Sequence, residues 1–278
     1  MKKDRAIVFT VSNNLTFAVS SIMMDIQRLS PNIVDEIVIL HNGIILEDQK
    51  LLSSILPTRF IKYVLPFEDR SFIPDRILDY FTEMVFAKFE CLKLLNDYKN
   101  VMLLDYDMVI QSDISELFDR CETGIKMMPS ESIVREQLHC SVEEYNMTNI
   151  NNCACLFILQ DHLKNYNNMY DFCYKSLEKY ADVIYLPEQA IFDFMLQEFN
   201  LQILPIDSRI YSPHPKDDQL APQAKIIHAY GQPKFWNGLE NEQWNNNYSK
   251  WIKMGGTKYK KPKLIHKMIK RIKKLFRK

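Results

Sequence analysis

The chain has no acidic residue after Glu242, although its 278 residues include 35 basic and 35 acidic side chains. Eleven of the basic residues lie within 258–278, which leaves 24 basic and 35 acidic residues in the rest of the chain. A body with this acidic excess is not expected to bind nucleic acid, because phosphates attract basic surfaces. The sequence therefore predicts an acidic body followed by a basic tail.

Long apolar runs are missing as well. No uncharged apolar stretch in the sequence approaches the roughly 20 residues of a transmembrane helix. The run Ala6–Val11, which follows a charged N-terminus, is too short for the apolar region of a secretory signal. We therefore expect neither a membrane-spanning helix nor a secretory signal, and we expect a cytoplasmic location.

Cysteines are too sparse for the framework that stabilises small disulfide-rich proteins. The six of them stand at positions 91, 121, 140, 153, 155 and 173. Cys153 and Cys155 are one residue apart, but no second Cys or His pair lies at the spacing of a zinc site. We expect free thiols, most of them buried.

The pattern that is present is an alternation of apolar runs and amphipathic segments, with no internal repeat. The apolar runs predict buried strands at residues 6–11, 36–40, 59–65, 101–104, 152–159, 202–205 and 224–228. The amphipathic segments predict helices at residues 17–29, 46–56, 80–95, 163–180 and 187–199. Strands that alternate with helices indicate an α/β fold with a parallel sheet, whose ligands bind beyond the carboxyl ends of the strands.

The most informative motif is the apolar run Val101–Ile110, which is broken by Asp105 and Asp107. In an extended strand both carboxylates would point the same way, because side chains alternate between the two faces. Two anions on one face repel each other, and a divalent cation such as Mg²⁺ or Mn²⁺ removes that cost. The motif predicts a metal site at the end of a central strand. A solvent-exposed Asp-x-Asp in a turn is the alternative.

A second polar cluster ends the chain's last predicted strand. His228 is a possible metal ligand, Gly231 would let the backbone approach a ligand closely, and Lys234 suits a phosphate. The alternative is a turn that follows an edge strand. In combination with an Asp-x-Asp motif, the cluster favours a binding site.

These motifs resemble those of the family-8 retaining glycosyltransferases, the group that includes glycogenin and bacterial lipooligosaccharide galactosyltransferases. The resemblance covers roughly residues 5–240 and rests on five motifs in order and spacing. They are Lys88, which lies 17 residues before Asp105; Leu103–Ile110 followed by Asp113–Asp119; Asn152–Ile158; Pro187–Ala190; and His228–Trp236. Each motif is weak alone, and the five together are specific.

The resemblance implies the GT-A fold: one domain at residues 1–255 with a Rossmann-like nucleotide-sugar-binding sheet, helices on both faces, and a basic tail at 256–278. It implies that Asp105, Asp107 and His228 bind Mn²⁺ (or Mg²⁺), which neutralises the diphosphate of a UDP-hexose donor. Donor-binding roles are implied for Ser12, Asn13, Asn14, Lys88, Asp105, Tyr106, Asp107, Asn152, Gly231 and Lys234. Catalytic roles are implied for Glu188, Gln189 and Lys234.

The implied reaction is transfer of a hexose to a glycan or glycolipid acceptor, such as lipopolysaccharide or a capsule-type polysaccharide, with retention at the anomeric carbon. Without the family context, Lys88 could be a solvated helix residue and Asn152 a turn cap. Glu188 and Gln189 could simply begin a helix after Pro187.

The chain departs from the family pattern at two places. Ser12-Asn13-Asn14-Leu15 stands where the family has an aspartate and an aromatic residue that hold uracil, so Leu15 offers no stacking. Ala190 replaces an aspartate near the sugar. Both departures change side chains that the resemblance places against the nucleotide and the donor sugar.

The tail has apolar residues at helical spacing, interleaved with Lys and Arg. They are Leu264, Ile265, Met268, Ile269, Ile272, Leu275 and Phe276. This pattern predicts an amphipathic helix on an anionic membrane surface, and hence a peripheral protein on the inner face of the cytoplasmic membrane. The alternative is a terminal helix that packs against the acidic body.

Two other functions remain open. The Asp105-x-Asp107 motif also matches haloacid-dehalogenase-like phosphatases, although that motif normally lies on the first strand of the domain. A degenerate, non-catalytic nucleotide-sugar-binding protein held at a membrane by its tail is the second, and Ser12, Leu15 and Ala190 give it some support.

Overall fold

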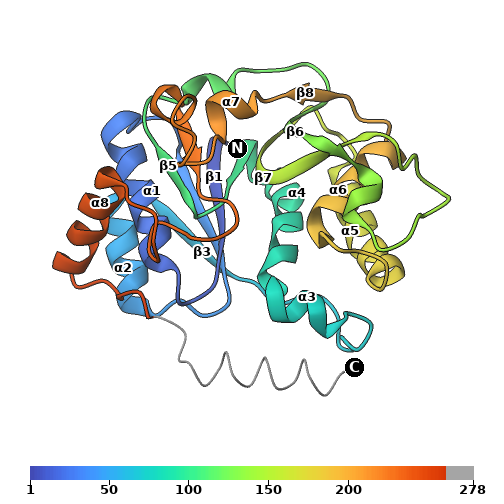
Figure 1. Cartoon of the computed structure of the whole chain (residues 1–278), viewed down its shortest axis with the longest axis horizontal. Coiled ribbons are helices and arrows are strands. Elements are labelled where there is room, and N and C mark those ends of the chain that lie inside the picture. Colours follow the sequence, from blue (N-terminus) through green and yellow to red (C-terminus); the bar gives the residue numbers. More distant parts are fainter. Residues whose placement is uncertain (261–278) are drawn as a thin grey trace.

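The computed structural model describes residues 1–260 of the chain. Its strands span Lys3–Val11 (β1), Glu36–His41 (β2), Thr58–Lys62 (β3), Tyr98–Leu104 (β4), Met108–Ile110 (β5), Ile125–Ile133 (β6), Ile150–Gln160 (β7), Ile203–Pro205 (β8) and Ile226–His228 (β9). Seven of them form one sheet in the order β3-β2-β1-β4-β7-β6-β8, and β5 pairs with β9 in a small second sheet (Figure 1). β4, which leads into the Asp-x-Asp motif, is therefore the central strand of the large sheet.

Helices cover both faces of this sheet, as the sequence predicted. The α-helices span Thr16–Leu29 (α1), Leu46–Ile55 (α2), Asp75–Tyr80 (α3), Glu90–Leu94 (α4), Tyr166–Tyr180 (α5), Pro187–Glu198 (α6), Ser208–Tyr211 (α7) and Glu242–Lys253 (α8). Short 3₁₀ segments span Glu83–Phe89, Ser115–Phe118, Val134–Gln137 and Ala221–Gln223. In Figure 1, α1, α2 and α8 lie on one side of the sheet and α3 to α6 on the other.

The central strands carry long apolar runs because both of their faces are buried. In β1, Ala6 and Val8 contribute to the core beneath α3 to α6, whereas Ile7, Phe9 and Val11 contribute to the core beneath α1, α2 and α8. All five side chains are fully buried. This two-sided burial is what produced the near-continuous apolar runs in the sequence.

The sheet is mostly parallel, with one reversed strand. β1, β2, β3 and β4 pair in parallel, and so do β6 and β8. β7 runs antiparallel to β4 and to β6. The predicted α/β fold class and its central sheet are confirmed. The prediction of an all-parallel sheet is wrong, because β7 runs antiparallel to its neighbours.

The helix predicted at 80–95 is also wrong in its form. α3 ends at Tyr80, Thr82 takes a positive φ of 63°, and a 3₁₀ segment then leads into the short α4. The Thr82 hydroxyl accepts a hydrogen bond from the backbone N–H of Met84. Residues 84–89 are all buried, so this segment packs on every side, whereas a predicted amphipathic helix would keep one face in water.

Several elements went unpredicted: α3, β5, β6, α7 and α8. None of the helices within residues 1–260 has the length and apolar character needed to cross a membrane. The amphipathic helix predicted for the tail lies outside the described residues, and so does most of the segment 256–278. The boundary at residue 255 stays a prediction.

Candidate active site

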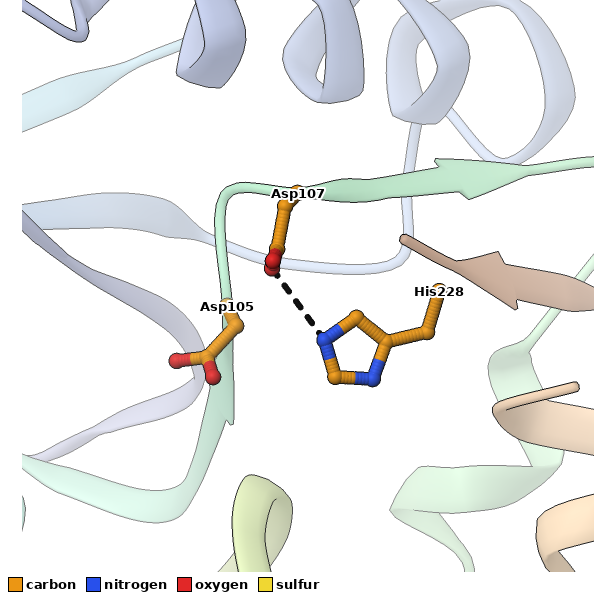
Figure 2. A group of neighbouring side chains, drawn as sticks. All are labelled: Asp105, Asp107 and His228. Carbon is orange, nitrogen blue, oxygen red and sulfur yellow. Dashed lines mark hydrogen bonds and ion pairs between the residues drawn. The ribbon is translucent and has the colours of Figure 1, made fainter. Parts of the chain in front are cut away.

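The Asp-x-Asp motif occupies a tight turn between the large and the small sheet. β4 ends at Leu104 and β5 begins at Met108, and the chain bends between them (Figure 2). The Asp105 N–H donates to the carbonyl of Cys155 over 2.9 Å, and the carbonyl of Asp107 accepts from the Ala229 N–H over 2.9 Å. The expectation of one extended strand is thus wrong, because a turn, rather than strand alternation, brings the two carboxylates together.

The pairing of β5 with β9 brings His228 to this turn. His228 lies opposite Met108 in the antiparallel register. One ligand atom from each of Asp105, Asp107 and His228 lies within 4.8 Å of the others, and Figure 2 shows the imidazole pointing towards the carboxylates. The three predicted metal ligands therefore come together in space.

Asp107 is the centre of one group of contacts. Its Oδ1 lies 3.2 Å from His228 Nε2, and its Oδ2 accepts from the ammonium of Lys234. Lys234 Nζ also donates to the carbonyl of Ala229 over 2.7 Å. The second ring nitrogen of His228, Nδ1, lies 3.0 Å from Ser212 Oγ, which holds the ring in place.

Asp105 belongs to a second group, centred on Lys88. Lys88 Nζ lies 3.0 Å from Asp105 Oδ1 and 3.1 Å from Glu188 Oε1. It also donates to the carbonyl of Ala154 over 2.9 Å. Lys88 and Glu188 are each only 6% exposed. The solvated-lysine alternative is excluded, since this ammonium is buried among three oxygen atoms.

Burial raises the pKa of Asp105, against the opposing effect of Lys88, and the neighbouring Asp107 raises it further. Burial also disfavours the ionised form of Asp107, but contacts with His228 and Lys234 outweigh it and lower that pKa. The ammonium of Lys88 loses hydration on burial, yet Asp105 and Glu188 raise its pKa. The site thus places negative charge on Asp107 and keeps Lys88 positive.

These residues fit a hard divalent cation. Two carboxylates and an imidazole are suitable ligands for Mn²⁺ and Mg²⁺, which prefer oxygen donors. Ser212 fixes the orientation of the imidazole by contacting Nδ1, the ring nitrogen that faces away from the carboxylates, as is usual for a histidine that binds a metal. The donor set therefore supports a divalent cation at Asp105, Asp107 and His228.

The site opens into a cavity of about 980 Å³, which is large enough for a nucleotide-sized ligand. Most of the predicted site residues line this cavity. They are Ser12, Lys88, Asp105, Tyr106, Asp107, Glu188, Gln189, His228, Gly231 and Lys234. Gly231 has φ = 70°, a backbone conformation that favours glycine.

Three of the predicted donor-binding residues lie elsewhere. Asn13 and Asn14 are exposed and are not part of the cavity wall. Asn152 is buried, and its side-chain amide donates to Asp193 Oδ1 over 2.7 Å. Its role in binding a donor stays a prediction.

Asp193, which sequence reasoning missed, joins α6 to β7. It accepts from the backbone N–H of Asn152 over 3.2 Å and from Gln137 Nε2 over 2.9 Å. Burial raises its pKa to about 7, although the hydrogen bonds from Asn152 and Gln137 oppose that change. No sequence motif marked this residue, because its partners are 41 and 56 positions away.

Other wall residues also went unpredicted. They include Tyr80, Thr82, Glu131, Arg209, His214 and Tyr230. Tyr230 is 54% exposed, and its ring centroid lies 5.5 Å from that of His228. Its position between His228 and Gly231 was a signal that could have found it. Arg209 and His214 come from an irregular, proline-containing stretch with no apolar periodicity that could have marked them.

The geometry agrees with the comparisons to known proteins. The glycosyl transferase family 8 model matches residues 6–240. A comparison with curated proteins finds no match. Three similar solved structures illustrate the fold, and their identities of 14–16% bear on the fold alone.

The bifunctional glycosyltransferase WbbM is 14% identical at a TM-score of 0.69 over 91% of this chain, which spans about half (51%) of WbbM. The galactosyltransferase LgtC, solved in complex with donor and acceptor sugar analogues, is 15% identical at a TM-score of 0.65 over 93% of this chain and 98% of LgtC. GlyE of Streptococcus pneumoniae TIGR4 is 16% identical at a TM-score of 0.59 over 91% of this chain and 64% of GlyE. Because the family match spans most of its length, the chain belongs to glycosyltransferase family 8.

Proposed function

We propose that this transferase moves a hexose from a UDP-sugar to a glycan or glycolipid acceptor, with Mn²⁺ as its cation and with retention at the anomeric carbon. The observation that carries the proposal is the convergence of Asp105, Asp107 and His228 within 4.8 Å on the wall of a 980 Å³ cavity. A cation bound there would neutralise a diphosphate and stabilise the charge that develops on the UDP leaving group.

Lys234 adds positive charge at the same place. Its ammonium contacts Asp107 and lies on the cavity wall, where it can donate to a phosphate oxygen of the departing UDP. Gly231 supports this arrangement, because a residue without a side chain lets the diphosphate approach the backbone.

The sugar would lie towards Lys88, Glu188 and Gln189, which line the same cavity. Glu188 contacts Lys88 and thus supplies electrostatic support on this side. We favour attack of the acceptor hydroxyl from the face that the UDP leaves, with Glu188 and Gln189 stabilising the positive charge on the sugar. A covalent intermediate on a nearby side chain is the alternative route to retention.

The acceptor is proposed to be lipid-linked, in line with a lipopolysaccharide or capsule-type polysaccharide. The support comes from the basic, amphipathic composition of residues 258–278, which suits an anionic membrane surface and a peripheral location on the inner face of the cytoplasmic membrane. Deletion of residues 258–278 should release the protein from phosphatidylglycerol vesicles, as measured by co-sedimentation. Unchanged binding would contradict this part of the proposal.

Family membership favours a transferase over the haloacid-dehalogenase-like phosphatase, whose Asp-x-Asp motif would lie on the first strand rather than after β4. The non-catalytic alternative makes a different prediction, because it binds the nucleotide without turning over the sugar. Ser12, Leu15 and Ala190, where the chain departs from the family pattern, are the residues that support this alternative.

Hydrolysis of UDP-sugars tests the proposal directly. UDP-glucose, UDP-galactose and their N-acetylated forms are incubated with the protein and Mn²⁺, and released UDP is measured. We expect Mn²⁺-dependent release from one donor above the others, and its loss in Asp105→Ala. Release of UDP from none of them would favour the non-catalytic alternative.

A further inference from the structure

Two cysteines form part of the cavity wall without a role in the proposed reaction. Cys153 and Cys155 both lie on β7, two positions apart, and both line the cavity. Side chains two positions apart on a strand share one face, and both of these side chains belong to the core beneath α1, α2 and α8. Cys153 is half-buried and Cys155 is buried, and both are free thiols. The cavity therefore gives a small reagent access to a thiol pair.

The spacing of the pair allows a disulfide, but not a relaxed one. Two positions on an extended strand span about 6.6 Å between Cα atoms, near the upper limit of about 6.8 Å for a disulfide. The pairing of β6 with β7 shifts register next to Cys153, between Met127 and Met128, so β7 is irregular here. A disulfide formed across this span would be strained and easily reduced, as is typical of regulatory disulfides.

Two backbone carbonyl groups in this part of β7 accept hydrogen bonds from Lys88 and from Asp105. The carbonyl of Ala154, the residue between them, accepts from Lys88 Nζ over 2.9 Å. The carbonyl of Cys155 accepts from the Asp105 N–H over 2.9 Å. A contraction of β7 between Cys153 and Cys155 must move these two carbonyl groups, and with them Lys88 and Asp105.

We propose that Cys153 and Cys155 are an oxidation site at which a hydroperoxide forms a reversible disulfide that displaces Lys88 and Asp105 and weakens donor binding. One thiol attacks the peroxide, the O–O bond breaks, and a sulfenic acid and one molecule of water (or alcohol) form. The second thiol then attacks the sulfenic sulfur, so an S–S bond forms and water leaves. The peroxide is reduced by two electrons, which the two sulfurs supply. The effect on the donor rests on the proposed function.

The test compares three proteins before and after treatment with hydrogen peroxide in the presence of a chelator: the unmodified chain, Cys153→Ser, and Cys140→Ser as a control at an exposed cysteine. Peptide mass spectrometry detects the Cys153–Cys155 bond as a loss of two hydrogens from the peptide mass. Hydrogen exchange measures the exchange rate of the Asp105 amide. Calorimetry with UDP and Mn²⁺, after the peroxide and chelator are removed, reads the affinity.

We expect the bond in the unmodified chain and in Cys140→Ser, faster exchange at Asp105, and a loss of UDP affinity of about tenfold or more, as for a lost charge-assisted hydrogen bond. Dithiothreitol should restore all three readouts, which separates the bond from methionine oxidation. In Cys153→Ser, peroxide should change neither exchange nor affinity.

The proposal is overturned if the bond does not form, if it forms while Asp105 exchange stays constant, or if Cys153→Ser responds as the unmodified chain does. A chain that binds no UDP even when reduced would contradict the proposed function instead. In that case the mass and exchange measurements still decide the oxidation site.

Discussion

The two aspartates of the Asp-x-Asp motif lie in opposite electrostatic surroundings, although one residue separates them. Asp105 shares the single ammonium of Lys88 with a second carboxylate, Glu188. Asp107 instead contacts two basic side chains, Lys234 and His228. The pKa of Asp105 is accordingly raised, mainly by burial, and that of Asp107 is lowered.

This difference indicates which residues of the site mainly stabilise the fold and which mainly bind the ligand. The Lys88 group joins the 3₁₀ segment 83–89, the turn after β4, β7 and α6 through one ammonium, which neutralises two carboxylates. The Asp107 group joins only the turn after β4 to β9 and the loop that follows it, and both groups line the cavity. We therefore expect changes at Lys88 to affect stability first and changes at Asp107 to affect binding first.

Replacement of Lys88 should give the largest effect. Lys88→Met leaves Asp105 and Glu188 buried without their cation, a change that costs about 3–5 kcal/mol of the free energy of unfolding. Urea denaturation followed by circular dichroism measures it. Lys179→Met is the control, because Lys179 pairs with Glu144 at the surface and its loss should cost about 0–1 kcal/mol. Equal losses in the two variants would contradict the distinction.

Replacement of Asp107 should affect binding rather than folding. Asp107→Asn keeps the shape of the side chain and removes the charge that holds the cation, so Mn²⁺-dependent UDP affinity should fall about 100-fold. Calorimetry at saturating Mn²⁺ measures the change, and Asp218→Asn, an exposed carboxylate outside the cavity wall, is the control. Retention of full affinity would remove Asp107 from the site.

Lys234→Ala should show a smaller loss. It removes one of the two partners of Asp107 and leaves His228 in place. We expect donor affinity to fall about tenfold, the effect of one charge-assisted hydrogen bond. The same titration with UDP measures it, and Lys225→Ala, whose ammonium pairs with Glu116, is the control. An identical loss in both variants would show a general charge effect.

Asp193 gives a pH dependence of the free energy of unfolding. Its pKa rises from 3.8 to about 7 on folding, since burial disfavours the ionised form. Between these values the folded chain binds more protons at this group than the unfolded chain, so its contribution to stability falls as pH rises from about 4 to 7 and is constant above. In Asp193→Asn the free energy of unfolding should fall less between pH 4 and pH 7 than in the unmodified chain, by about 1 kcal/mol or more. Urea midpoints across pH 4 to 8 check it, and an unchanged slope would contradict it.

The sequence predicted the parts of the fold that burial alone determines. The parallel strands β1, β2 and β4 were recognised because both of their faces are apolar. β7 was recognised as a strand, but its reversed direction was not, because an apolar run looks the same in both directions. The helix predicted at 80–95 failed because residues 84–89 are buried on every side, which an amphipathic pattern does not describe.

The Asp105-x-Asp107 motif indicated a metal site from its residues alone, but only the resemblance to a family joined His228 to it as the third ligand. Asp107 and His228 are 121 positions apart, and Lys88 and Glu188 are 100 apart, so no local spacing could pair them. The order of the motifs, compared with that of the family, indicated that these distant residues belong to one site, and in the structure they are in contact. The contact of Asn152 with Asp193 had no such signal, because Asp193 stands outside the motifs that were matched.

The proposed site requires that binding of the nucleotide depends on a bound divalent cation. Titration of UDP into the full chain by calorimetry, once with Mn²⁺ and once with a chelator, measures that coupling, and Asp105→Ala repeats it. We predict binding that depends on Mn²⁺ in the unmodified chain and a loss of that dependence in Asp105→Ala. UDP binding of equal affinity with and without Mn²⁺, or binding undiminished in Asp105→Ala, would contradict the proposed site.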